Sequence, residues 1–216
     1  MREKFREDME NLKKELEEMG SLAVGMLTDA VKALKEQDAG LANEVISRKK
    51  ELADMDERIE EKALTMIAIY QPMAKDMRTI GAVLKIITYL ARIGRYGKDI
   101  AKVAIELSDK PHIGKMVEIP YMADVVAGMV RDAINAFKTE DLSLIENFSE
   151  RDDELDSLRY SIFRECLTYM MEDPKNITRC SHYIMIARYL ERCGDHACKI
   201  AEKVYYMSTG KRIEIK

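Results

Sequence analysis

The sequence predicts an all-α protein of six long helices, arranged as two tandem three-helix bundles. Three observations point to this fold class. Alanine, leucine, glutamate, lysine, methionine and isoleucine dominate the 216 residues, with four prolines and no tryptophan. Apolar residues recur at helical spacing along almost the whole chain. The second half also repeats the first, so each half is expected to hold three helices.

Charge and hydropathy exclude several classes of protein. Charged residues make up 34% of the chain, but they nearly balance and leave a net charge of −4. A general nucleic-acid-binding protein normally has a basic face and a high pI, so we expect no nucleic-acid partner. Neither a signal-peptide core nor an apolar run of the ~18 residues that a membrane span needs is visible. The four cysteines form no CxxC pair, which favours reduced core thiols in a cytosolic protein.

Helix-capping and helix-breaking residues between the apolar stripes indicate the helix boundaries. Asp38 is a plausible N-cap, and Gln71-Pro72 ends a helix because proline disfavours helical backbone at the preceding residue. Asp173-Pro174 is typical of an N-cap followed by the first helical residue. The helices are expected over about residues 5–36, 38–70, the stretch after Pro72 to 108, 121–138, 141–171 and from 174 onward. Residues 211–216 receive no assignment.

A proline- and glycine-containing stretch over 109–114 is the clearest linker in the chain. We expect a first repeat over residues 1–108, a linker over 109–116 and a second repeat over 117–216. Residues before the middle turn recur 103 positions later, as Arg48 does at Arg151, and later residues recur at an offset of 100. One three-residue length change explains both offsets. A three-helix unit can bury a core by itself, so the bundles could pack side by side or end to end.

Differences between the two copies single out four acidic residues. Each pair is spaced by four, so its side chains project from one helix face beside the apolar stripe. The acids Asp152, Asp156, Glu191 and Asp195 have Lys49, Ala53, Ala91 and Arg95 as first-half counterparts. If the two shoulders face each other, the carboxylates converge and need a cation to offset their repulsion. The sequence therefore predicts a metal site at these acids, with Mg, Mn or Fe favoured over Zn.

Ordinary helix chemistry offers an alternative for the same residues. Acid pairs at this spacing are frequent in a chain with 39 aspartates and glutamates. Glu191 could pair with Arg188, and Asp195 with Lys199, as solvated ion pairs worth ~0.3–0.5 kcal/mol each. In that case the acids form only a charged helix face.

Three neighbouring residues bear on the choice. Cys198 and His196 could add softer metal ligands, although a buried thiol and a surface histidine are the commoner states of such residues. Gly194 costs the helix ~1 kcal/mol relative to alanine, which indicates that something approaches the helix closely there. No glycine-rich phosphate loop, Ser/His/Asp set or Cys/His dyad accompanies them.

Together these motifs resemble the PhoU family of phosphate-transport regulators. Residues 189–197, YLERCGDHA, are similar to the family's LERxGDxA signature. Residues 151–156, RDDELD, are similar to the acidic motif on the partner helix. Residues 71–78, QPMAKDMR, resemble the turn between the second and third helices of a repeat. The likeness spans about residues 5–207 and covers both copies.

The resemblance implies two three-helix bundles with metal clusters held by E(D)xxxD motifs. It also implies a non-enzymatic regulator of phosphate uptake and homeostasis, cytoplasmic and peripherally associated with the membrane. The expected partners are a phosphate transporter component, a sensor histidine kinase in bacteria, and a second copy in a homodimer. The first repeat departs from the pattern, so no metal cluster is expected there and Arg95 is expected to pair with Asp99. A metal-dependent phosphate-binding or hydrolytic protein using the same carboxylates is the alternative function.

Overall fold

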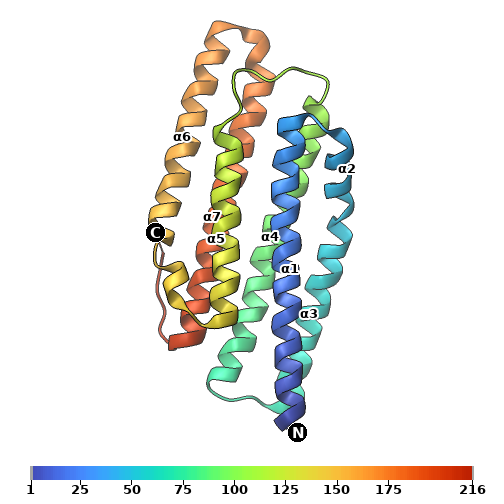
Figure 1. Ribbon diagram of the computed structural model, residues 1–216, viewed down its shortest axis with the longest axis vertical. Helices are drawn as coiled ribbons and strands as arrows, with labels where there is room; N and C mark the ends of the chain where they lie inside the picture. The colour runs from blue at the N-terminus through green and yellow to red at the C-terminus, as the bar shows by residue number, and fades with distance from the viewer. Residues whose placement is uncertain (1, 216) are drawn as a thin grey trace.

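The computed structural model describes residues 2–215, and helices make up most of them (Figure 1). The first half contains α1 (Arg2–Glu36), α2 (Ala39–Ser47), α3 (Lys49–Tyr70) and α4 (Lys75–Leu107). The second half contains α5 (Glu118–Thr139), α6 (Phe148–Glu172) and α7 (Ile177–Thr209), with 3-10 helices η1 (Leu142–Ile145) before α6 and η2 (Pro174–Asn176) before α7. No strand occurs in this described range, and the predicted all-α fold is confirmed.

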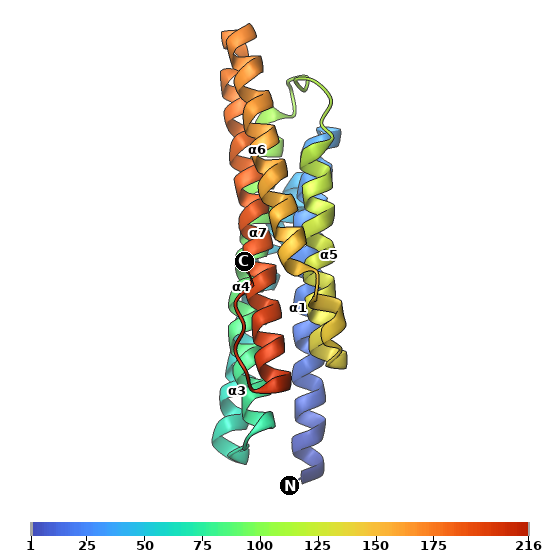
Figure 2. The same ribbon diagram turned by 90° about the vertical axis from the view of Figure 1, so that its left-hand side faces the viewer.

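The two bundles lie side by side and run along one long axis. In Figures 1 and 2, α1 and α5 lie next to each other, and α4 and α7 lie behind them. The α2–α3 segment flanks α1 and α4 of the first bundle, and α6 flanks the second bundle on the opposite side. Contacts between α4 and α7, and between α1 and α5, join the repeats. Of the two arrangements that the sequence left open, the structure has the side-by-side one.

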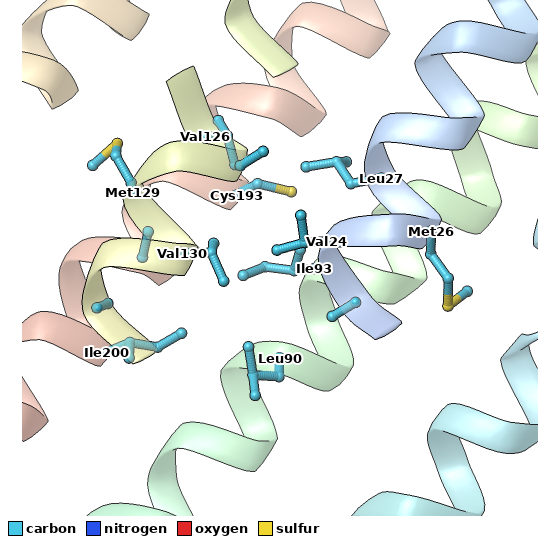
Figure 3. Packing of buried hydrophobic residues seen from close by; sticks show 14 of the residues in the cluster. Val24, Met26, Leu27, Leu90, Ile93, Val126, Met129, Val130, Cys193 and Ile200 are labelled. Carbon is cyan, nitrogen blue, oxygen red and sulfur yellow. The ribbon is translucent and has the colours of Figure 1, made fainter. Parts of the chain in front are cut away.

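One continuous apolar core fills the space between the bundles. Figure 3 shows side chains of α1, α4, α5 and α7 in this core, where Leu27, Ile93, Val126, Val130 and Cys193 face one another between the repeats and Met26 and Met129 point into the interiors of their own repeats. All of those labelled are buried: Val24, Met26, Leu27, Leu90, Ile93, Val126, Met129, Val130, Cys193 and Ile200. Separating the repeats would expose the side chains that face one another between them, which costs about 25 cal/mol for each Å² of apolar surface. The hydrophobic effect therefore holds the two repeats together as one unit.

Helix boundaries follow the sequence signals, with two differences. Oδ1 of Asp38 accepts the N–H of Leu41 at 3.0 Å, and Gln71 ends α3 with a left-handed φ of 47°, as expected at these breaks. The predicted second helix is divided at Arg48 into α2 and α3. The predicted fifth and sixth helices begin as η1 and η2, because the side chains of Asp141 and Asp173 each cap a short turn locally instead of starting an α-helix.

The division at Arg48 accompanies an ion pair that recurs in both repeats. Arg48 Nη1 lies 2.6 Å from Asp29 Oδ2, and its counterpart Arg151 Nη1 lies 2.7 Å from Asp132 Oδ2. Each pair links the first helix of a repeat to its second and is only partly exposed. The internal repeat is thus conserved in side-chain contacts as well as in backbone.

The connection between the repeats and the C-terminal segment are both held against helices. Nδ1 of His112 lies 2.9 Å from the Tyr183 hydroxyl, and its Nε2 lies 3.2 Å from the Lys35 carbonyl oxygen. The linker is therefore anchored on both repeats. After α7, Gly210 adopts φ 73°, and residues 211–215 run back beside that helix (Figure 2). This tail contributes to the walls of two surface cavities.

Candidate metal site between α6 and α7

The four predicted ligands lie on adjacent helices, with Gly194 between them. Asp152 and Asp156 belong to α6, and Glu191 and Asp195 belong to α7. A Cβ atom on Gly194 would lie 2.4 Å from Leu155 Cδ1, so the glycine allows α6 and α7 to approach closely. The group that approaches α7 closely at Gly194, as the sequence led us to expect, is therefore the Leu155 side chain.

The first repeat contains the same close approach. A Cβ atom on Gly94 would lie 2.2 Å from Leu52 Cδ2. Because the first repeat has no acids at the equivalent shoulders, this glycine–leucine packing serves the fold in both halves. Gly194 is thus no argument for a metal ion, and the candidate site depends on the carboxylates alone.

The electrostatics of the carboxylates show that they influence one another. Burial raises the pKa of Asp152 to about 6, and the nearby charges of Asp195 and Asp156 add to the rise. Burial also raises the pKa of Glu191, where Asp195 adds to the effect and Arg159 opposes it. The pKa of Asp195 is raised in the same way, first by burial and then by Asp156. Partial burial and mutual repulsion thus disfavour the charged forms.

An arginine that the sequence reasoning missed enters this cluster. Arg159 Nε lies 3.7 Å from Asp156 Oδ1 and 3.8 Å from Glu191 Oε1, both long for an ion pair. The same nitrogen is buried, and its N–H donates to no hydrogen-bond acceptor among the described residues. The spacing of three residues between Asp156 and Arg159 was the signal that could have found it. One positive charge at such distances only partly balances the carboxylates.

The four carboxylates are the kind of ligand that a hard or borderline cation takes, but their side chains are not arranged around one point. Carboxylate oxygens are the ligands that Mg, Mn and Fe take, and the raised pKa values reflect burial first and then mutual repulsion, which a bound cation would offset. Within residues 2–215, no three His, Cys, Asp or Glu side chains are placed to hold one ion. Side-chain rotation would be needed to close the carboxylates around a metal. The predicted site stays a prediction.

Two alternative ion pairs expected from the sequence are wrong. Lys199 Nζ lies 2.7 Å from Glu202 Oε1, so its partner is Glu202 and not Asp195. In the first repeat, Asp99 Oδ1 lies 3.0 Å from Lys98 Nζ, so Arg95 is not its partner. In the first case Lys199 pairs with a different acid three residues away, and in the second a neighbouring lysine pairs with Asp99 in place of Arg95.

The two softer candidate ligands have other roles. Cys198 is buried, and its thiol donates a hydrogen bond to Asp152, which acts against the rise of the Asp152 pKa. His196 stacks on Tyr89 and Tyr96 of α4, with ring centroids 5.8 and 6.1 Å apart. Burial lowers the His196 pKa to about 4, and the charges of two arginines contribute. The expectation of a surface histidine is wrong, since the ring is half-buried between the repeats.

Comparison with known proteins identifies the fold and the repeat together. The PhoU domain profile matches residues 16–104 and, a second time, residues 119–204. This chain belongs to the PhoU family. The phosphate-specific transport system accessory protein PhoU homologue of Rhizobium meliloti (strain 1021) is 40% identical over 207 residues, which cover 95% of this chain and 87% of the relative. The homologue of the same name from Clostridium acetobutylicum is 35% identical over 212 residues, covering 98% and 97%.

Solved structures of PhoU proteins agree with this assignment. The crystal structure of PhoU from Pseudomonas aeruginosa superposes with a TM-score of 0.91 at 35% identity, covering 96% of this chain and 100% of that one. PhoU from Streptococcus pneumoniae superposes with a TM-score of 0.89 at 22% identity, covering 97% and 99%, which supports the fold alone. Both PhoU repeats here keep the Arg–Asp pair and the glycine–leucine contact, and the second alone carries the four acids.

Proposed function

We propose that the protein regulates phosphate uptake through contact with a component of a phosphate transporter, and that a metal ion bound by its second repeat shapes the contact surface. The observation that carries the proposal is the match of both repeats to the PhoU family, whose curated relatives are named accessory proteins of a phosphate-specific transport system. The family is one of accessory proteins, so the expectation that the chain is not an enzyme is confirmed. Regulation by binding follows, and not catalysis.

Support for the metal comes from the charge balance between α6 and α7. Asp152, Asp156, Glu191 and Asp195 would hold the ion, and Mg, Mn or Fe is favoured over Zn because every donor is an oxygen. When bound, the metal supplies the positive charge that the cluster lacks. Arg159 then becomes redundant as a counter-charge and is free to leave the carboxylates. In the first repeat, the exposed Lys49 and Arg95 would repel a cation.

Support for a protein contact comes from an exposed apolar stripe on α6. Tyr160, Phe163, Leu167 and Met171 recur at helical spacing, and their exposed fractions are 57%, 38%, 41% and 86%. Apolar patches of this kind mark sites of protein interaction. No helix among the described residues is long and apolar enough to cross a membrane. We therefore propose a peripheral contact with the transporter on the inner side of the membrane, with a sensor kinase or a second copy as further partners.

Two measurements test this function. Metal analysis of freshly purified protein should find Mn, Fe or Mg in the wild type and lose it in Glu191→Ala/Asp195→Ala. The control is Glu57→Ala/Glu61→Ala, which removes an acid pair of the same spacing from the first repeat. If the site variant keeps its metal, or the wild type holds none above background, the four acids are only a charged surface.

The contact itself is tested by co-purification with transporter components. Leu167→Glu/Met171→Glu should reduce recovery of the transporter and release phosphate uptake from regulation, because it places charge on the stripe. Unchanged recovery would contradict a contact through α6. A phosphatase assay with and without Mn or Fe separates the alternative function. Turnover that disappears in Glu191→Ala/Asp195→Ala would favour a hydrolase using the same carboxylates.

A further inference from the structure

A groove with an excess of positive charge lies away from the carboxylates, farther along α7 toward its C-terminal end. It is bounded by the first half of α4, the last turns of α7 and the C-terminal tail, and encloses about 550 Å³. Arg78, Lys85, Lys203 and Arg212 line it. The lining part of α7 begins at Glu202, seven residues beyond Asp195, so the groove is roughly two helical turns from the candidate metal site.

Three of the four cations that line the groove have no carboxylate partner among the described residues. Glu202 is the one acidic residue in its lining, and its Oε1 already pairs with Lys199 Nζ at 2.7 Å. Of the four lining cations, only Lys203 pairs with a carboxylate within residues 2–215, at 4.0 Å from Glu202. The groove thus keeps a positive charge in a chain whose net charge is −4. Such a concentration of one sign attracts ligands of the opposite sign.

Contacts within the protein hold the groove in shape. Glu202 is 7% exposed, and its Oε1 accepts the backbone N–H of Ile215 at 3.2 Å, which fixes the tail along α7. Arg212 from the tail lies over the Tyr206 ring, 5.7 Å from its centroid. Arg78 Nε donates to the Met207 carbonyl oxygen at 3.3 Å. Two arginines are therefore positioned in advance, which lowers the entropic cost of binding.

The internal repeat supplies a comparison for this groove. At the opposite end of the α4–α7 pair, the offset of 100 places Thr178, Met185 and Val103 where Arg78, Lys85 and Lys203 stand. The pairing of the two helices is the same at both ends, so it does not require these cations. Their presence at one end points to a ligand.

We propose that this groove binds a small molecule with two or more phosphate groups and an aromatic part, of the class of nucleoside diphosphates. Arginine matches phosphate geometry through paired N–H donors, and lysine adds point charge. The volume lies in the range of small-molecule sites and exceeds what a single phosphate fills. Tyr206, with the Arg212 guanidinium over its ring, adds planar surface on which an aromatic ring of a ligand can stack. The ligand would bridge α4 of the first repeat, α7 of the second and the tail, and so stabilise their arrangement by mass action.

Calorimetric titration of the full-length protein with ADP tests the proposal. We expect saturable binding that weakens with added salt, because screening reduces the attraction. Lys85→Ala/Arg212→Ala should weaken it roughly tenfold or more. The matched control is Lys32→Ala/Lys50→Ala, which removes the same charge from exposed positions of α1 and α3 and should leave ADP affinity unchanged.

A second variant blocks the groove without a change of charge. A Cβ atom on Gly81 would meet no atom within 4 Å, so Gly81→Leu can extend into the lined space while the helix folds. It should also abolish ADP binding. The proposal is overturned if ADP does not bind, if the site variants bind it like the control, or if inorganic phosphate binds as tightly as ADP. Association with phosphatidylglycerol vesicles in the absence of ADP binding would overturn it too, since the ligand would then be a lipid headgroup.

Discussion

Asp152 makes the metal-free protein less stable as the pH rises. Its pKa is about 6 in the folded protein, against an ordinary value of 3.8 that applies to the unfolded chain. A raised carboxyl pKa means that the folded state binds the proton more tightly. The stability that the neutral acid provides is therefore fully present below pH 3.8 and is lost as the pH rises through about 6. Asp152→Asn keeps the side chain neutral throughout and should avoid this loss.

The magnitude follows from the shift. About two pH units correspond to about 3 kcal/mol, and solvent screening at this partly exposed site reduces the figure to about 1–2 kcal/mol. In the presence of a chelator, Asp152→Asn should gain this much stability over wild type at about pH 7 and only a small part of it at about pH 4. Urea titrations across this range measure the difference.

An exposed acid of the same helix supplies the control for Asp152. Glu150→Gln removes one negative charge from α6 at a position that is not among the charges raising the pKa of Asp152, so its difference from wild type should change little with pH. Added Mn should reverse the order, since wild type gains a ligand that Asp152→Asn holds less well. If the stability curves of Asp152→Asn and wild type run parallel from about pH 4 to pH 7, burial and repulsion do not act on Asp152 as inferred.

Three further predictions concern the packing of the repeats. Gly194→Ala should lower the unfolding free energy by about 1–3 kcal/mol in urea titration, because its Cβ would lie 2.4 Å from Leu155 Cδ1. Gly81→Ala, where a Cβ meets no atom within 4 Å, should instead raise the unfolding free energy by up to ~1 kcal/mol. Equal effects of the two variants would contradict the packing at Gly194. Arg151→Met should cost about 1–2 kcal/mol by leaving its aspartate without a partner, and a thermal unfolding midpoint equal to wild type would show that the pair contributes nothing. The imidazole of His196 should titrate by NMR near pH 4. Because its ordinary pKa is 6.5, the stability that the neutral ring provides is present above pH 6.5 and is lost as the pH falls through about 4. An NMR midpoint near 6.5 would place the ring in water.

Local signals in the sequence were enough for most of the helix boundaries. Asp38 caps α2, and Gln71 ends α3, because capping and the restriction before proline act over a few residues. The division at Arg48 was missed, since the helical pattern runs through it without proline or glycine. The acid pairs on α6 and α7 were likewise visible as spacing. Their mutual influence depends on how two helices approach, which spacing does not contain.

Arg159, Lys199 and the cationic groove show where sequence reasoning stopped. Arg159 reaches Glu191 on another helix, and Lys199 selects Glu202 over Asp195 although both were within its range. Choices among rotamers depend on the space that neighbouring helices leave. The groove joins residues of α4 to residues of α7 and the tail that lie more than a hundred positions later in the chain, so no local pattern could reveal it.

The sequence by itself determined the helices, the repeat, the family and the asymmetry between the halves, because composition, periodicity and the identity of residues at equivalent positions are properties of the chain alone. Only the tertiary structure decided that the bundles lie side by side, that Gly194 admits a leucine, and that the tail folds back to place Arg212 beside α4 and α7. These features come from apolar surfaces that must be buried against partners distant in sequence. The free energy of that burial depends on shape, and shape exists only once the helices have packed.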